Sequence, residues 1–387
     1  MKKSLILLSL ILTIFSCKDN TSSPKENKAD VITIDINDSE SKSDLSFFDI
    51  ISDLKVIELK GIPELNQIGR IKKVVQYDGK FLVYDDLKSN ILIFNSNGLY
   101  ERLLGERGAG PQQYERISDF DINKKQNKIY ILNNPYLLSY DFNGKFIDKK
   151  LLDFYPVKMS VMNDSNIAFN LPTLDDEFCH LIFSDGNGDL ISKSACYEVF
   201  GGFIGNSRTG GVNSVTSKTY YNYTGISDIY EIDSEYNFNI KFKFNLGADM
   251  WPSEKQENVG DFRKRFKSNT VSFLYNSYFI NENWMIFEYK ISGKENTLKA
   301  HYDIKRNELF TSKSFKDGKL IDLLGVPVGL DEELRIISSI DFEEYNELKD
   351  IDNIKETIKE FDENLYNGLN KLSLSNTYLL ITYTIEK

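Results

Sequence analysis

Short runs of alternating apolar and polar residues, separated by turn-forming residues, dominate this chain. Between residues 91 and 121, one run ends at the turn Asn95–Gly98, returns through 100–104, crosses a glycine-rich segment and begins again near Ile117. Alternation with a period of two predicts strands, and Asn and Gly accept the positive φ that a tight hairpin requires. The stretch therefore predicts the outer hairpin of one β-sheet, a crossing loop and the first strand of the next sheet.

The same kind of turn recurs at a nearly constant interval. Glycines close such turns at Gly98, Gly144 and Gly188, which are 46 and 44 residues apart, and weaker echoes occur at 233–236 and 303–307. Each turn follows one strand-like run, and a further strand pair precedes it within the period. Four short strands in about 40 to 50 residues are typical of a propeller blade. We therefore predict an all-β fold, a six-bladed β-propeller of four-stranded antiparallel blades over residues 31–387.

The last apolar run of the chain, Tyr378–Ile385, has to find a partner strand. An open ring of blades would leave sheet edges unpaired, which favours a ring closed by strands from both ends of the chain. We expect this run to share a blade with an N-terminal strand, either 31–36 or 55–59.

The segment 342–369 departs from the strand pattern. Its apolar residues recur every three or four positions, at Leu348, Ile351, Ile354, Ile358, Phe361 and Leu365. This spacing predicts an accessory C-terminal amphipathic helix. We expect the helix to pack on the propeller beside its last blade. Docking to a membrane or to a partner helix is the alternative, although the acidic outer face disfavours an anionic membrane surface.

The first 16 residues predict an export signal. Lys2 and Lys3 precede an apolar run that is too short to span a bilayer as a permanent helix. The stretch 14–17 resembles the lipobox of bacterial lipoproteins, with Phe15 larger than the residue that is usual there, so we expect Cys17 to be lipidated. An ordinary signal peptide is the alternative. Residues 17–30 are polar and predict a flexible tether.

Net charge narrows the range of partners. The chain has a formal net charge of −11, and removal of residues 1–16 leaves −13 because two lysines and no acidic residue are lost. An acidic chain without a run of Lys or Arg is unsuited to bind a phosphate backbone, so we expect no nucleic-acid partner.

Two of the three cysteines bracket a predicted hairpin. Cys179 and Cys196 are centred on the turn 186–188, so a regular hairpin would place them opposite each other. In an exported protein this register allows a disulfide between them. Two free, buried thiols on a slipped register are the alternative.

The glycine pattern Gly105-x-x-Gly108-x-Gly110-Pro111-x-x-Tyr114, preceded by the Phe94–Gly98 hairpin, resembles an NHL repeat. More broadly, the chain resembles the six-bladed β-propeller lipoproteins of Gram-negative bacteria. Segments 50–59, 68–71 and 81–85 are similar to the opening of that family, and 375–381 is similar to its closing strand, although Thr377 stands where Pro is usual. The resemblance implies a lipid-anchored propeller and no particular activity.

The crossing loop Gly105–Pro111 is the first candidate site. Glycine N–H groups can cradle a phosphate, but the loop lacks the Gly-Lys-Ser/Thr ending of a P-loop and no helix follows it. We interpret the glycines as a requirement of a tight blade-to-blade crossing. Arg107 and Arg116 flank this crossing, and we predict that they bind ligand at the rim of the channel. Structural ion pairs with Glu106 or Glu115 are the alternative.

Other candidate chemistry is weaker. The stretch 185–189 resembles the start of a calcium loop, but Leu190 replaces the required Gly and Cys196 the bidentate Glu, which favours a hairpin turn. His180 and His301 have no metal-ligand spacing, and we expect His180 in a strand. No Gly-x-Ser-x-Gly elbow is present. We therefore predict no metal, no cofactor and no catalytic residue.

Together these features predict an envelope-anchored binding or scaffold lipoprotein. We expect it to be exported and held by lipid on Cys17 at the outer membrane, on the periplasmic face or the cell surface. Its ligand would be a small molecule, glycan, peptide or protein that is recognised at one mouth of the channel. The alternative is a lyase or glycan hydrolase that uses channel carboxylates, Tyr and Arg.

Overall fold

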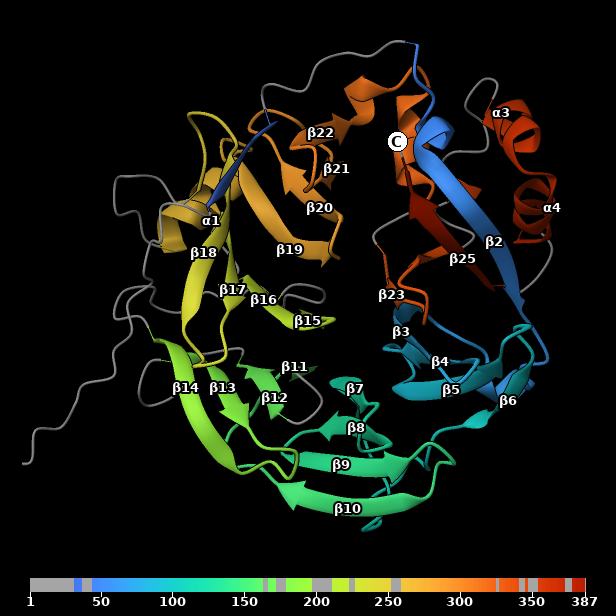
Figure 1. Ribbon diagram of the computed structural model, residues 1–387, viewed down its shortest axis with the longest axis vertical. Coiled ribbons are helices and arrows are strands. Elements are labelled where there is room, and N and C mark those ends of the chain that lie inside the picture. The colour runs from blue at the N-terminus through green and yellow to red at the C-terminus, as the bar shows by residue number, and fades with distance from the viewer. Residues whose placement is uncertain are drawn as a thin grey trace, which may run out of the picture.

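The computed structural model describes residues 31–36, 44–162, 166–171, 179–196, 211–222, 227–251, 259–324, 327–340, 345–346, 354–372 and 378–386. The predicted signal peptide and tether, with Cys17, lie outside the described residues. Six sheets are arranged in a ring, with one strand of each sheet nearest the centre (Figure 1). The chain is a six-bladed β-propeller of four-stranded antiparallel blades, as the sequence predicts.

Each blade runs from an innermost strand beside the channel to an outermost strand. The first two blades are β3 (Ile71–Tyr77), β4 (Lys80–Asp85), β5 (Asn90–Asn95) and β6 (Tyr100–Leu103), then β7 (Asp119–Asn123), β8 (Lys128–Asn133), β9 (Tyr136–Asp141) and β10 (Phe146–Leu151). The next two are β11 (Lys158–Met162), β12 (Asn166–Asn170), β13 (Cys179–Ser184) and β14 (Leu190–Cys196), then β15 (Gly211–Val215), β16 (Lys218–Asn222), β17 (Asp228–Ile232) and β18 (Phe238–Asn245). The last two are β19 (Phe273–Ile280), β20 (Trp284–Lys290), β21 (Leu298–Asp303) and β22 (Glu308–Thr311), then β23 (Gly329–Leu330), β24 (Ile336–Ile340), β25 (Tyr378–Ile385) and β2 (Ile51–Leu59).

The sixth blade closes the ring with strands from both ends of the chain. β25 pairs antiparallel with β24 on one side and with β2 on the other, in a register that runs from Leu59–Tyr378 to Ile51–Ile385. Trp284 of the fifth blade donates its indole N–H to the carbonyl oxygen of Ile385 at 3.0 Å. Of the two N-terminal strands that the sequence offered, 55–59 therefore closes the ring.

The other N-terminal strand, β1 (Ile32–Asp35), joins a different blade. It pairs in parallel with β18 and becomes a fifth, outermost strand of the fourth blade. Ile34 is 2% exposed and packs in a cluster with Phe242 and Phe244 of β18. The strand therefore buries apolar surface at an edge that β18 would otherwise expose.

The repeated turns join the third and fourth strands of successive blades. Asn95 Oδ1 accepts the backbone N–H groups of Asn97 and Leu99 at 3.0 and 3.1 Å, and the same pattern recurs at Asp141, Asp185 and Asp233. Gly98 has a φ of +74°, and a Cβ there would lie 2.2 Å from the carbonyl oxygen of Glu58. Glycine is required at this turn both for its backbone conformation and for its close approach to β2.

The C-terminal helical segment consists of two helices where the sequence predicted one. α3 (Ile354–Phe361) and α4 (Glu363–Leu372) are separated at Asp362, whose Oδ1 accepts the backbone N–H of Leu365 at 2.7 Å as an N-terminal cap. The described part of the predicted apolar face is buried beside the sixth blade, in a core cluster that includes residues of β24 and β25, and Ile358 and Leu365 are 0% exposed. Phe361 stacks on Phe48 at 4.1 Å between ring centroids. The helices therefore pack beside the last blade, as predicted.

Short helices complete the described chain. They are α1 (Val259–Lys267), which lies between β18 and β19, and the 3₁₀ turns η2 (Phe47–Ile50), η3 (Glu64–Asn66), η4 (Ser312–Ser314) and η5 (Gly318–Asp322). Within the described ranges, every helix is too short or too polar to cross a membrane.

Ring closure generates a prediction about stability. Leu380 in β25 is 0% exposed and packs against the first blade, so we expect Leu380→Ala to lower the free energy of unfolding by about 2–5 kcal/mol. Urea denaturation would measure the loss. Leu190→Ala in β14, where the side chain is 57% exposed, is the matched control. Equal, small effects of the two changes would contradict a last strand integrated into a closed ring.

Candidate functional site

The innermost strands of neighbouring blades are linked by hydrogen bonds around the channel. Asp119 and Asp121 of β7 accept the backbone N–H groups of Met159 and Val161 of β11 at 3.0 and 2.9 Å. One blade further on, Ser160 Oγ of β11 accepts the N–H of Ser214 in β15 at 2.8 Å. Inner strands have an edge without a strand partner, so these side chains satisfy backbone donors that would otherwise depend on channel water.

A cluster of charged residues lies among these strands. We call Lys72 and Lys73 of β3, Asp119 and Asp121 of β7 and Lys158 of β11 the channel cluster. Lys73 Nζ lies 3.5 Å from Asp119 Oδ1 and 3.9 Å from Asp121 Oδ1, and it donates a hydrogen bond to the carbonyl oxygen of Phe120 at 2.5 Å. Burial disfavours the charge on Lys73, but Asp119 and Asp121 outweigh it, so the pKa of this ammonium is raised above its ordinary value.

Lys158 has the opposite electrostatic balance. Protein surrounds it on the inner strand, and this burial lowers its pKa to about 7, with Lys73 and Lys72 adding to the shift and Asp119 opposing it. Its side chain nevertheless keeps partial solvent exposure, as expected for a residue that faces an internal channel. A lysine with this pKa changes its charge near neutral pH, which makes Lys158 a candidate for recognition of charge at the channel wall.

Arg116 lies near the end of the channel at which the inner strands begin. Asn133, 7% exposed, accepts the backbone N–H groups of Glu115 and Arg116 through Oδ1 at 3.2 and 3.1 Å, which fixes the start of the second blade. Burial raises the pKa of the Tyr84 phenol above its ordinary value, and the exposed Arg116 side chain opposes this shift. Lys72 Nζ lies 5.8 Å from the centroid of the same ring. Arg116 and Lys72 therefore both lie in the surroundings of Tyr84.

Arg107 is also exposed, on the crossing loop itself. Its Nη1 donates to the carbonyl oxygen of Lys88 at 3.3 Å, so it bridges the crossing loop and the β4–β5 turn. Both predicted rim residues thus belong to loops at the same end of the blades. The structure adds the channel cluster, which sequence reasoning missed because its members come from three blades.

The glycine-rich loop uses its own backbone donors internally. Gly108 N–H donates to the carbonyl oxygen of Tyr114 at 2.9 Å, and Gly110 N–H donates to Gln113 Oε1 at 2.9 Å. The Tyr114 hydroxyl, fully buried, donates to the carbonyl oxygen of Leu104 at 3.0 Å. These N–H groups do not form a phosphate cradle, which supports the interpretation of a blade-to-blade crossing.

The remaining candidates occupy structural positions. Asp185 closes the β13–β14 hairpin, so the calcium-like stretch is a turn. His180 in β13 and His301 in β21 are each 1% exposed and lie in third strands, away from the inner strands. Burial, and secondarily Lys299, lowers the pKa of His301 to about 3, so it stays neutral at ordinary pH. Among the described residues, no group of His, Cys, Asp and Glu is arranged to hold a metal ion.

The β13–β14 ladder places Cys179 directly opposite Cys196, as the spacing predicts. Cys179 is 2% exposed. Directly paired residues of antiparallel strands have Cα atoms about 4.5–5.5 Å apart, within the range that a disulfide spans. We therefore propose the Cys179–Cys196 disulfide as a brace of the third blade.

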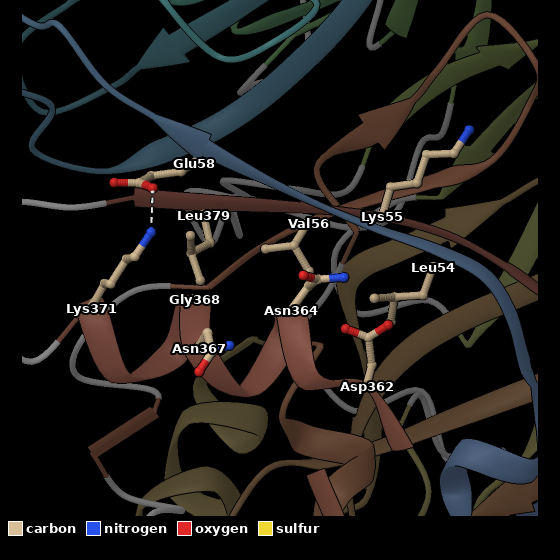
Figure 2. Close-up of a pocket in the computed structure, with 10 residues that line it drawn as sticks. All are labelled: Leu54, Lys55, Val56, Glu58, Asp362, Asn364, Asn367, Gly368, Lys371 and Leu379. Atoms are coloured by element: carbon tan, nitrogen blue, oxygen red, sulfur yellow. Dashed lines mark hydrogen bonds and ion pairs between the residues drawn. The ribbon is translucent and has the colours of Figure 1, made fainter. Parts of the chain in front are cut away.

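A second candidate site lies outside the ring, where α4 packs against β2. A groove of about 720 Å³ is lined by Leu54, Lys55, Val56, Glu58, Asp362, Asn364, Asn367, Gly368, Lys371 and Leu379. Figure 2 shows Leu54 and Val56 directed toward α4, Lys55 directed away from it, and an ion pair between Glu58 and Lys371 at one end. The two charged atoms of that pair, Glu58 Oε2 and Lys371 Nζ, are 3.0 Å apart.

Close packing of α4 on β2 depends on Gly368. A Cβ at this position would lie 3.1 Å from Val56 Cγ1 and 3.2 Å from Leu379 Cδ1, so the helix approaches the sheet through a residue without a side chain. The groove follows this line of contact. No single residue type in the sequence marks it, because its two walls come from opposite ends of the chain.

The fold and the channel define a six-bladed β-propeller with charged inner strands. Residues 31–373 match the family described as "Domain of unknown function (DUF4934)", and the chain belongs to this family. No curated protein matched the sequence.

Solved structures share the architecture. A Bacteroides fragilis protein provisionally named as exported is similar over 92% of this chain and 100% of its own, at 17% identity and a TM-score of 0.70. A member of the DUF4221 family from Bacteroides vulgatus is similar over 87% of this chain and 98% of its own, at 13% identity and a TM-score of 0.49. At 17% identity, the likeness to the Bacteroides fragilis protein shows the fold alone.

The lowered pKa of Lys158 predicts a pH-dependent stability. Between pH 7 and its ordinary value of 10.5, the unfolded chain binds the proton that the folded chain has lost, so stability should rise with pH across this window. Lys158→Met should therefore raise the free energy of unfolding most below pH 7, and the gain should shrink toward pH 10. Denaturation at pH 6 and pH 10 would measure it, with the exposed Lys125→Met as control. A gain of the same size at both pH values would contradict the assignment.

The proposed disulfide has a direct chemical test. Peptide mapping of the purified, non-reduced protein should yield one cross-linked species that contains Cys179 and Cys196. Reduction should lower the free energy of unfolding by about 3 kcal/mol, the value expected for a closed loop of this length. Two thiols that react with a maleimide in the unfolded, unreduced protein would contradict the bridge.

Proposed function

We propose that this protein is an exported, lipid-anchored propeller that binds a ligand at one mouth of its channel and does not transform it. The observation that carries the proposal is the convergence of charge at one end of the ring. Arg116 and Lys72 both lie in the surroundings of Tyr84, and Lys73 and Lys158 belong to inner strands. Loops at the end of a rigid scaffold are the usual place for recognition, because they vary without disturbing the blades.

The balance of charge favours an anionic ligand. The channel cluster contains three lysines and two aspartates, and Arg107 and Arg116 add two exposed cations near the mouth. The exposed neighbours Glu106 and Glu115 leave five cations against four acidic groups, a small local excess of positive charge on a chain with a net charge of −11, and this excess would favour an anion at the channel. A carboxylated or sulfated glycan, an acidic peptide and an acidic protein surface all fit this description.

The engagement of the channel carboxylates supports binding over catalysis. Asp119 and Asp121 are hydrogen-bonded to the backbone of the next blade and lie near Lys73. A general acid or base must reach the group whose proton it transfers, and both carboxylates are instead engaged in contacts that link neighbouring blades. A lyase or glycan hydrolase would have to use these same carboxylates, so the alternative requires breaking contacts that link the blades.

The proposed cellular location rests on the N-terminal sequence. Lys2 and Lys3, the apolar run and Cys17 form a lipoprotein signal, and the polar stretch 17–30 would separate the propeller from the membrane. We place the propeller at the outer membrane, on the periplasmic face or the cell surface.

The binding proposal is tested with the purified protein and pools of anionic glycans and acidic peptides. We expect retention of ligand without product, weaker retention at high salt, and a loss of about tenfold in affinity for Arg116→Ala and for Arg107→Ala. Lys125→Ala, in the β7–β8 turn at the opposite end of the blade, is the control. Formation of a product that is lost in Asp119→Asn or Asp121→Asn would contradict the binding proposal and indicate an enzyme. If both arginine variants retain the ligand unchanged, Arg107 and Arg116 do not belong to the binding site.

A further inference from the structure

The outer edge of β2 is open where the groove begins. β2 is the outermost strand of the closing blade and pairs with β25 along its inner edge. Along the part of the chain that the structure describes, no strand pairs with its outer edge over residues 54–57. Such an edge presents N–H and C=O groups that can accept another extended segment.

The same edge already binds an extended segment a few residues away. Lys60 N–H donates to the carbonyl oxygen of Gly98 at 2.9 Å, and Tyr100 N–H donates to the carbonyl oxygen of Lys60 at 2.9 Å. Backbone groups of alternate residues in a strand point to the same side, so those of Glu58, Val56 and Leu54 point outward as those of Lys60 do. The Gly98 turn already covers the Glu58 carbonyl, so the edge is open from Leu54 to Ile57. The strand-pairing surface therefore continues from an occupied end into the groove.

The groove supplies contacts for side chains next to this edge. Leu54, Val56 and Leu379 form an apolar floor, and Gly368 brings the helix close to it. Side chains of alternate residues share a face of a strand, and Figure 2 shows that Leu54 and Val56 occupy the α4 side while Lys55 occupies the other.

The polar wall fits peptide groups. Asn364 and Asn367 stand three residues apart on the exposed side of α4, and neither amide hydrogen-bonds within the described residues. Each amide offers both a donor and an acceptor, the pair of functions that a backbone peptide group also carries. The lining contains no aromatic ring on which a sugar could stack, which disfavours a saccharide.

We propose that the α4–β2 groove is a second binding site, distinct from the channel mouth, that takes an extended peptide segment of a partner protein. The segment adds as a strand to the outer edge of β2 beside residues 54–57, a span of about 13 Å. Every second side chain enters the groove over Val56 and contacts Asn364 and Asn367. The Glu58–Lys371 ion pair bounds one end of the groove and Asp362 lies at the other, so the central side chains of the peptide are uncharged and small or aliphatic.

The test uses random heptapeptides displayed on phage and selected on the purified full-length protein. Synthetic copies of the enriched peptides are then titrated against Asn367→Trp, which places an indole in the groove. Glu360→Trp, an exposed change on the neighbouring α3, is the matched control, and thermal unfolding verifies that each variant folds. We expect the dissociation constant to rise at least tenfold for Asn367→Trp and to stay unchanged for Glu360→Trp and Arg116→Ala.

Two further measurements separate strand addition from other modes of binding. Amide hydrogen exchange of residues 54–57 should slow when the peptide binds, and N-methylation of alternate peptide residues should abolish binding. If Asn367→Trp unfolds the protein, the double variant Asn364→Ala with Asn367→Ala is used instead and should show the rise in dissociation constant. The proposal is overturned if selection enriches no peptide, if the enriched peptides bind Asn367→Trp as well as the native protein, or if exchange slows elsewhere and not at residues 54–57.

Discussion

This fold depends on one constraint: the backbone hydrogen-bonding groups at the edges of six small sheets must find partners. A sheet edge leaves backbone donors and acceptors without partners, and a ring of blades has both inner and outer edges. At the seam, β25 pairs with β2, so that strands from the two ends of the chain complete one blade. Around the channel, Asp119, Asp121 and Ser160 accept N–H groups from the next inner strand. Strand pairing thus holds the ring at its seam, and side chains link the blades near its axis.

The same side chains that link the blades give the channel its electrostatic character. Lys73 is stabilised by two carboxylates, whereas burial and neighbouring lysines disfavour the charge on Lys158. Two lysines on inner strands therefore behave differently because one has its counter-ions within 4 Å and the other is dominated by desolvation. An anion that enters the channel would meet a fixed positive charge at Lys73 and a pH-sensitive one at Lys158.

The C-terminal helices give the closing blade a surface that the other described blades lack. α3 and α4 pack an apolar face beside the sixth blade, and Gly368 lets α4 rest directly on β2. This arrangement stabilises the blade that depends on pairing between distant strands. It also shapes a groove beside an open strand edge, so a structural brace and a candidate binding surface occupy the same place.

Local hydrogen bonds explain what the sequence alone determined. The turns at Asn95, Asp141 and Asp185 are closed by side chains that reach only two and four residues ahead, so their repetition revealed the blades and their number. The opposition of Cys179 and Cys196 followed from the same short-range geometry.

The tertiary structure alone decided which distant elements meet. Strand 31–36 has an alternating pattern that is compatible with pairing to many strand edges. Only the exposed apolar edge of β18 determines where it binds. Apolar periodicity runs on through Asp362, so the break between α3 and α4 depends on a cap that the pattern does not reveal. Lys73, Asp119 and Lys158 come from three blades, and the groove joins residues 54–58 to 362–379. Contacts of this kind depend on how the blades close around one axis, a geometry that no local sequence signal encodes.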